Sequence, residues 1–193
     1  MPRPREFDDS TALDAAMETF WTKGYEAATT AELCENTGLG RGSLYNAFGS
    51  KHALYEAALG HYTEVGYART MDILRAPGEP GERLRALLLW VIDTDLADPD
   101  RRGCLAINAS VDTAGRSGPV TELTRRHFER LEQALREVIE EGQRAGEFAA
   151  DGDPVRLART LQSTYYGMRV LGAVARDRAA LLDVAEGALA ALR

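Results

Sequence analysis

The chain has 193 residues, of which 45 % are hydrophobic and 27 % are charged, and its formal net charge is −7. This composition is typical of a folded chain, and the negative charge argues against a protein that binds polyanions over its whole surface. The longest apolar run, residues 86–92, is far too short to cross a bilayer, and residues 1–10 contain no secretory signal. We therefore expect a soluble, cytoplasmic protein with no membrane partner.

The first part of the chain is patterned for four helices, and the period-2 alternation of strands is nearly absent. The first helix is expected from about residue 9 to residue 24. A capping box formed by Thr29 and Glu32 begins a short second helix, and Gly38 ends it. After a third short helix, Ser50 is a suitable N-cap for a long fourth helix that continues to residue 74.

The remaining chain is patterned for five further helices. Residues 76–82 form the clearest loop, and Pro119 and Pro154 each suit the first position of a long helix. The later helices are expected at residues 83–95, 104–113, 119–144, 154–175 and 179–192. The sequence therefore predicts an all-α fold of about nine helices.

Residues 37–48, TGLGRGSLYNAF, join the second and third helices through a glycine-containing turn. Two short helices preceded by a longer one are typical of a helix-turn-helix unit, whose second short helix presents small and polar side chains to DNA. The third helix supplies a guanidinium, a residue without a side chain, two hydroxyls and an amide: Arg41, Gly42, Ser43, Tyr45 and Asn46. A phosphate-binding loop would need a preceding strand and another glycine spacing, and a plain structural turn is the simpler alternative. The pattern favours DNA reading.

Residues 12–59 resemble the N-terminal DNA-binding domain of the TetR family of transcriptional regulators. The resemblance is carried by Phe20, Gly24, Tyr25, Thr29, Gly38, Leu39, Gly42, Ser43, Leu44, Tyr45, Phe48, Gly49, Ser50, Lys51 and Leu54. It implies a homodimeric repressor that a small-molecule effector releases from a palindromic operator in double-stranded DNA. It also implies a DNA-reading domain at residues 1–50 and an effector-binding and dimerisation domain at residues 51–193.

The resemblance also implies which residues contact the operator. Tyr45 and Lys51 would touch phosphates, and Thr29 or Thr30 would anchor the backbone. The residues expected to face the major groove are Arg41, Gly42, Ser43 and Asn46. Gly40 departs from the family, which more often has serine or threonine at this cap, and glycine is a weaker but tolerated cap.

The predicted DNA-reading domain has a negative net charge. Residues 1–51 carry more acidic than basic side chains, so any positive surface must be local. We expect it to be formed by Arg3, Arg5, Arg41 and Lys51 together with the N-terminal amides of two helices.

The rest of the chain holds candidates for an effector pocket. They are Tyr62, Trp90, Cys104, Asn108, Asp112, Phe128, Tyr165, Tyr166 and Met168. For each residue alone, ordinary core packing is the simpler interpretation. Asn108 and Asp112 lie four residues apart on an apolar helix, so both fall on one face. If that face is buried, both need a partner, either a ligand or a neighbouring arginine.

Cys104 suggests an alternative function. Arg101 and Arg102 precede it at the start of a helix, and such surroundings favour the thiolate. The alternative is therefore a regulator that senses oxidants or electrophiles through Cys104, while a buried and inert cysteine is the simpler interpretation. The other cysteine, Cys34, lies in an unrelated segment, so we expect neither a disulfide framework nor a zinc site.

Enzyme function is the third possibility, and the sequence argues against it. None of the histidines, His52, His61 and His127, has a glutamate three residues before it, as the di-iron helical bundles require. There is also no Gly-x-Ser-x-Gly motif. We expect all three histidines at the surface, no metal site and no cofactor.

The last two predicted helices are rich in leucine, alanine and glycine, which allow close helix packing. The residues concerned are Leu157, Leu161, Gly167, Leu171, Gly172, Leu181, Leu182, Ala185, Ala188 and Leu189. The family resemblance assigns these two helices to a four-helix dimer interface. Packing within one chain is the alternative.

Overall fold

The computed structural model describes residues 9–113 and 118–193, and over these ranges the chain contains nine helices and no strand, as predicted. Among the described residues, no helix is both long and apolar enough to span a membrane. The helices are α1 (Asp9–Ala27), α2 (Thr30–Thr37), α3 (Arg41–Phe48), α4 (Lys51–Leu74), α5 (Pro80–Ala97), α6 (Leu105–Asp112), α7 (Pro119–Ala145), α8 (Pro154–Val174) and α9 (Arg178–Ala190).

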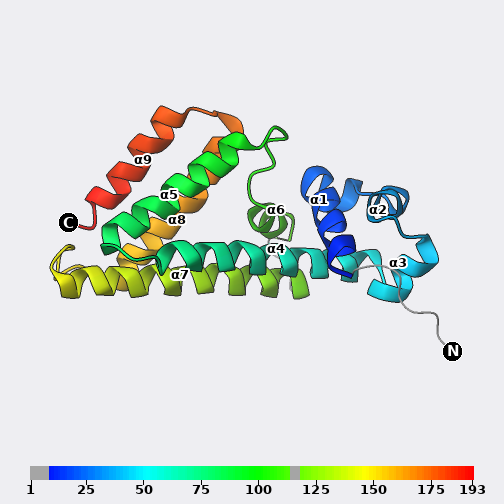
Figure 1. Ribbon diagram of the computed structural model, residues 1–193, viewed down its shortest axis with the longest axis horizontal. Helices are drawn as coiled ribbons and strands as arrows, with labels where there is room; N and C mark the ends of the chain where they lie inside the picture. Colours follow the sequence, from blue (N-terminus) through cyan, green and yellow to red (C-terminus); the bar gives the residue numbers. More distant parts are fainter. Residues whose placement is uncertain (1–8, 114–117) are drawn as a thin grey trace.

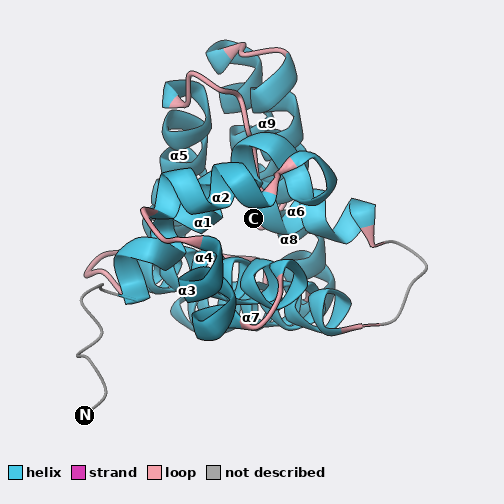
Figure 2. Ribbon diagram, turned by 90° about the vertical axis from the view of Figure 1, so that its right-hand side faces the viewer, coloured by secondary structure: helices cyan, strands magenta, loops and turns pink. Residues whose placement is uncertain are grey.

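Helices α4 and α7 lie side by side and run along the length of the molecule (Figure 1). Helices α1, α2 and α3 gather at one end of α4, and α5, α8 and α9 pack at the other. Figure 2 views the molecule from the end that carries α1, α2 and α3. Because α4 contacts α1, α3, α5, α6 and α7, it connects the two ends directly.

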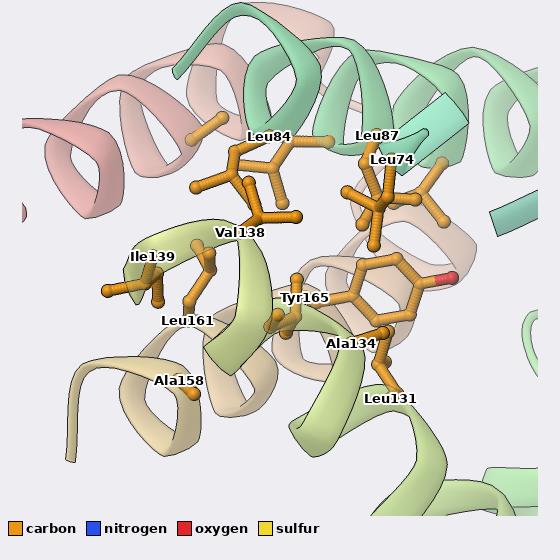
Figure 3. Close-up of a cluster of buried hydrophobic side chains, with 14 of the residues drawn as sticks. Leu74, Leu84, Leu87, Leu131, Ala134, Val138, Ile139, Ala158, Leu161 and Tyr165 are labelled. Carbon is orange, nitrogen blue, oxygen red and sulfur yellow. The ribbon is translucent and has the colours of Figure 1, made fainter. Parts of the chain in front are cut away.

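Each of the two ends has its own hydrophobic core. The larger core packs α5, α7, α8 and α9 around residues such as Leu84, Ile139 and Leu161 (Figure 3). The smaller core contains Phe20 of α1 and Leu44 of α3, both fully buried, and it includes residues of α6. Burying a side chain of this size contributes about 1.5–3 kcal/mol. The three N-terminal helices therefore rest on α4 and α6 through one continuous apolar contact.

The helix ends follow the predicted capping residues. The Glu32 amide donates to the Thr29 hydroxyl over 3.2 Å, and the Thr29 amide donates to the Glu32 carboxylate over 3.0 Å, which completes the capping box. The Ala53 amide donates to the Ser50 hydroxyl over 3.0 Å at the start of α4. Gly38 ends α2 with a left-handed φ of 69°, a conformation that glycine adopts without the steric cost of a Cβ atom.

Two details differ from the sequence-based expectation. Gly24 does not end α1: it interrupts the helix with a φ of 77°, and one further turn reaches Ala27. Helix α5 begins at Pro80, earlier than expected, because proline suits the first turn of a helix. For the apolar face of the last two helices, the alternative of packing within one chain holds in part: Leu161, Gly172, Leu181 and Ala185 are all buried.

Candidate functional site

The N-terminal part of α3 presents an exposed polar surface. Leu44 is fully buried and holds the inner face of this short helix against the smaller core. The residues on its outer face are exposed: Arg41, Gly42, Ser43 and Asn46. The outer face of α3 is therefore open to a partner. The N-terminus of a helix favours a negatively charged group such as a phosphate.

Tyr45 connects the two short helices. Its hydroxyl lies 2.8 Å from the Thr30 hydroxyl at the start of α2, so the two groups share a hydrogen bond. The guanidinium of Arg41 lies 5.9 Å from the centroid of the Tyr45 ring, within the range of a cation–π contact. The structure therefore brings Thr30, Tyr45 and Arg41 together and fixes the relative placement of α2 and α3.

Lys51 lies where α1 ends and α4 begins. Its ammonium donates to the Glu26 carbonyl over 3.3 Å and lies 4.7 Å from the centroid of the Tyr25 ring. An ammonium group has three donors, so Lys51 can still donate to a phosphate. Its side chain is thus positioned by α1 before any nucleic acid binds.

Three acidic side chains of the N-terminal helices, Asp14, Glu18 and Glu32, have partners within the chain. Lys23 pairs with Glu32, and this hydrogen bond, together with those from Thr29, lowers the pKa of Glu32 to about 2. The predicted contributors Arg3 and Arg5 lie outside the described residues.

Two further acidic side chains of α1 point toward the rest of the molecule. Glu18 pairs with Arg102 of the loop before α6. Asp14 lies 2.7 Å from the ring of His61 on α4. Because these carboxylates face partners in the body of the molecule, they do not add their negative charge to the exposed face of α3.

A cavity of about 200 Å³ lies between α1, α4, α5, α7 and α8. It is lined by Met17, Trp21, Tyr62, Val65, Gly66, Tyr67, Thr70, Trp90, Thr94, His127, Leu131, Tyr165 and Arg169. Three of the residues predicted for an effector pocket, Tyr62, Trp90 and Tyr165, line it. A mostly apolar cavity with a few polar groups is typical of a small-molecule site.

Trp21 joins this cavity to the N-terminal helices. Its ring packs edge-on against Tyr62 of α4, with centroids 4.9 Å apart. Arg102 lies over the same indole, with its guanidinium carbon 4.2 Å from the ring centroid. One wall of the cavity is thus formed by the helix that leads into α2 and α3.

One residue of the cavity wall, Arg169, belongs to a buried ion pair. Arg169 donates to both carboxylate oxygens of Asp95, over 2.8 and 3.0 Å, and only 7 % and 5 % of the two residues' surface is exposed. The Arg169 guanidinium also lies 3.4 Å from the Tyr62 hydroxyl and from the Gly103 carbonyl. Burying either charge alone would be very costly, so each group requires the other.

His127 is half-buried and faces the cavity, whereas the sequence-based expectation placed it on a solvated face. It lines the cavity, with its ring 6.3 Å from that of Tyr166. Burial, and then the positive charges of Arg169 and Arg130, lower its pKa to about 4. The imidazole is therefore uncharged at neutral pH. The neighbouring Arg125 is exposed and pairs with glutamates on the outer face of α7.

Four other predicted pocket residues lie near the cavity without lining it. Phe128 packs edge-on against Tyr166, with centroids 4.9 Å apart, and the buried Tyr166 hydroxyl has no hydrogen-bond partner among the described residues. Met168 is buried in the larger core. Cys104 is 2 % exposed at the start of α6, which agrees with its interpretation as a buried cysteine.

Asn108 and Asp112, also predicted for the effector pocket, do not line the cavity. Both lie on exposed positions of α6, so the shared face is not buried. The Asn108 amide donates to the Arg102 carbonyl over 3.1 Å. Asp112 lines a separate surface hollow with Lys23 and His52. The apolar residues of α6 that turn inward are Leu105, Ala106 and Ala109, so the polar pair faces the other way.

The N-terminal helices and the cavity behind them define a helix-turn-helix DNA-binding regulator. The sequence matches the model of the bacterial regulatory proteins of the tetR family at residues 12–58 and that of the tetracyclin repressor-like C-terminal domain at residues 80–188. The chain belongs to the TetR family of transcriptional regulators.

Relatives with similar length agree with this assignment. The HTH-type transcriptional regulator YezE of Bacillus subtilis is 29 % identical over the whole of both chains. The HTH-type transcriptional repressor ComR of Escherichia coli is 30 % identical over 87 % of this chain and 80 % of its own. A cysteine mutant of the TetR family regulator CifR, solved with 26-bp operator DNA, is 34 % identical over 99 % of this chain and 100 % of its own, with a TM-score of 0.86. The chain is a TetR-type DNA-binding transcriptional regulator.

Proposed function

We propose that this regulator is a homodimeric repressor that a small-molecule effector releases from a palindromic operator. The observation that carries the proposal is the shared wall of the cavity: Trp21 belongs to α1, and Tyr62 belongs to α4. A molecule in the cavity contacts both helices that hold the DNA-reading domain. If it binds the released arrangement more tightly than the DNA-bound one, it shifts the equilibrium toward release.

The proposed DNA contacts follow the exposed face of α3. Arg41, Gly42, Ser43 and Asn46 read the major groove, Tyr45 and Lys51 contact phosphates, and Thr29 and Thr30 anchor the backbone. The relative CifR was solved with 26-bp operator DNA, which supports operator binding as such. In a dimer, the two DNA-reading domains would engage successive major grooves about 34 Å apart.

The dimer proposal is supported by exposed apolar side chains on the last two helices. Val170, Leu171 and Val174 of α8 are 51 %, 49 % and 75 % exposed, and Val184 of α9 is 38 % exposed. Covering such residues with a second copy would remove apolar surface from water. Light scattering should give the mass of a dimer, and Val174→Asp should shift the protein toward the monomer. A monomeric wild type at micromolar concentration would contradict the proposal.

The proposed function also suggests a domain boundary and a cellular location. We place the DNA-reading domain at residues 1–50 and the effector-binding and dimerisation domain at residues 51–193, with α4 as the helix that transmits movement between them. A repressor acts where chromosomal DNA lies, which in bacteria is the cytoplasm.

Effector control is tested with the operator complex and small molecules from the host cell. We expect the low-molecular-mass fraction of a host extract to dissociate the wild-type complex. A Gly66→Leu variant should resist it, because Gly66 lines the cavity and its side-chain position is open. Equal release of both proteins would show that the effector binds elsewhere, and a wild-type complex that no fraction dissociates would contradict effector control.

A second candidate function is sensing of oxidants or electrophiles through Cys104. The observation in its favour is that burial, and then the Cys104 thiol, raise the pKa of Tyr62, which lines the cavity, although Cys104 is buried. Cys104→Ser should then abolish release by peroxide or quinone while leaving operator binding intact. An unchanged response in that variant would remove this candidate.

A further inference from the structure

We infer that the effector is an uncharged compound built on one aromatic ring, an inference that rests on the proposed effector role of the cavity between α1, α4, α5, α7 and α8. Its volume, the rings in its wall and the balance of its charges support this chemical class independently of one another.

The volume limits the size of the ligand. An apolar cavity of about 150 Å³ is large enough to bind benzene. The cavity of this protein has about 200 Å³. It therefore takes one six-membered ring with a small substituent, and larger effectors would require the walls to move apart.

The wall favours an aromatic ligand. The rings of Trp21, Tyr62, Trp90, Tyr165 and His127 all contribute to it. Aromatic rings attract one another in offset and edge-to-face arrangements, and Trp21 and Tyr62 already adopt an edge-to-face contact. A flat ring can make the same contacts with several of these neighbours at once.

The one charge in the described wall is neutralised by a carboxylate outside the wall. Arg169 is the one lining residue among those described that carries a full charge at neutral pH, and Asp95 neutralises it through two hydrogen bonds. A carboxylate or ammonium group on the ligand would lose its water and find no opposite charge to replace it. The cavity therefore discriminates against charged compounds of the same size.

An uncharged polar substituent does find partners in the cavity. His127 is neutral and makes no hydrogen bond to the described residues, so its ring nitrogens can donate or accept. The hydroxyls of Tyr62 and Tyr165 are protonated at neutral pH, as phenols ordinarily are, and burial raises the pKa of both groups further. A hydroxyl, carbonyl or amide on the ring fits these groups.

The test uses the full-length protein and four matched probes: benzamide, benzyl alcohol, benzoate and benzylammonium. Binding is measured at neutral pH by calorimetry and by the shift in melting temperature. We expect the uncharged probes to bind at least about tenfold more tightly than the charged ones, because an unpaired charge is costly to bury. Equal or tighter binding of benzoate or benzylammonium would overturn the inference, as would a lack of binding by all four at millimolar concentration.

Two glycine variants assign this binding to the cavity. Gly66 and Gly60 both lie in α4 with no atom within 4 Å of the position that a Cβ would occupy, but only Gly66 lines the cavity. Gly66→Leu should abolish binding of the uncharged probes, whereas Gly60→Leu should leave it unchanged. The same affinity in both variants would overturn the assignment.

A third variant tests the charge balance. In Asp95→Asn the charge of Arg169 is no longer neutralised, so benzoate should gain about tenfold or more relative to benzamide. Circular dichroism checks that the variant is folded, and the wild-type series decides the question if it is not. A folded variant with unchanged preference would show that charge balance does not set selectivity.

The operator assay separates this inference from the proposed function. Benzoate could bind the wild type but not Gly66→Leu, and could also dissociate the operator complex. That result would support the effector role of the cavity and contradict the inference that the effector is uncharged. If benzamide binds in the cavity but leaves the operator complex intact, the ligand class stands and the effector role fails.

Discussion

Arg102 lies over the indole ring of Trp21, with its guanidinium carbon 4.2 Å from the ring centroid, and this contact joins the loop before α6 to the DNA-reading domain. The same indole packs edge-on against Tyr62 at the wall of the cavity. Arg102 is held in turn by Asp98 and Glu18. A ligand that moves Trp21 must therefore disturb a contact that holds α1 against the rest of the molecule.

Arg102→Gln should weaken communication between the cavity and the operator. It removes the cation–π contact and both ion pairs, so we expect operator binding to persist while the coupling free energy falls by about 0.5–2 kcal/mol. The measurement is the ratio of operator affinities with and without ligand. The exposed neighbour provides the control as Arg101→Gln, and the same ratio in both variants would show that Arg102 has no part in coupling.

Arg41 and Lys51 should fail in different ways when they are removed. Arg41→Ala should cost about 1–3 kcal/mol on the operator and relax base preference, because Arg41 lies on the exposed face of α3. Lys51→Ala should weaken binding to all sequences and reduce the salt slope by about 1. Titrations on operator and random DNA at several salt concentrations distinguish the two. Equal losses on both DNAs for Arg41→Ala would contradict its role in base reading.

His127 should make the folded state sensitive to acid. Its pKa is about 4 in the folded chain and about 6.5 in an unfolded one, so the unfolded chain binds more protons between these values. The free energy of unfolding should therefore fall as the pH drops from about 6.5 to about 4, by at most about 3 kcal/mol. His127→Gln should remove this part of the pH dependence, as followed by urea unfolding. An imidazole that titrates near its ordinary pKa in the folded protein by NMR would contradict the placement of His127 at the cavity beside Arg169 and Arg130.

Gly38 should be sensitive to substitution, whereas Gly40 should not. Gly38 has a φ of 69° at the end of α2, so Gly38→Ala should cost about 1 kcal/mol of stability. Gly40 is an N-cap in an extended conformation with a φ of −64°. Gly40→Ser should be neutral or stabilise by a few tenths of a kcal/mol. Thermal unfolding measures both effects, and equal losses would show that backbone conformation is not the cause.

The DNA-reading helices could be predicted from the sequence because their signals are local. Thr29 and Glu32 form their capping box within one turn, and Gly38 and Leu44 follow within a few residues. Such short-range patterns determine where a helix begins, where it ends and which face it buries. For the same reason, the exposed face of α3 was predictable.

The cavity could not be predicted in the same way, because its walls come from distant parts of the chain. Arg169 and Asp95 lie 74 positions apart, and nothing near either residue indicates the pairing. Trp21 belongs to α1, whose helical pattern is that of an ordinary amphipathic helix. His127 follows two arginines and resembles a surface residue until the packing of α7 against α8 turns it inward. Tertiary contacts of this kind leave no periodic signal in the sequence.

The most direct measurement is a footprint of the purified protein on the DNA that flanks its own gene, at low salt, with Arg41→Ala in parallel. We expect the wild type to protect two half-sites about one helical turn apart, to lose affinity as salt rises, and to lose this protection in Arg41→Ala. A wild type that protects no part of this DNA, or an Arg41→Ala variant that protects the same sites with equal affinity, would contradict the assignment of α3 as the helix that reads the operator.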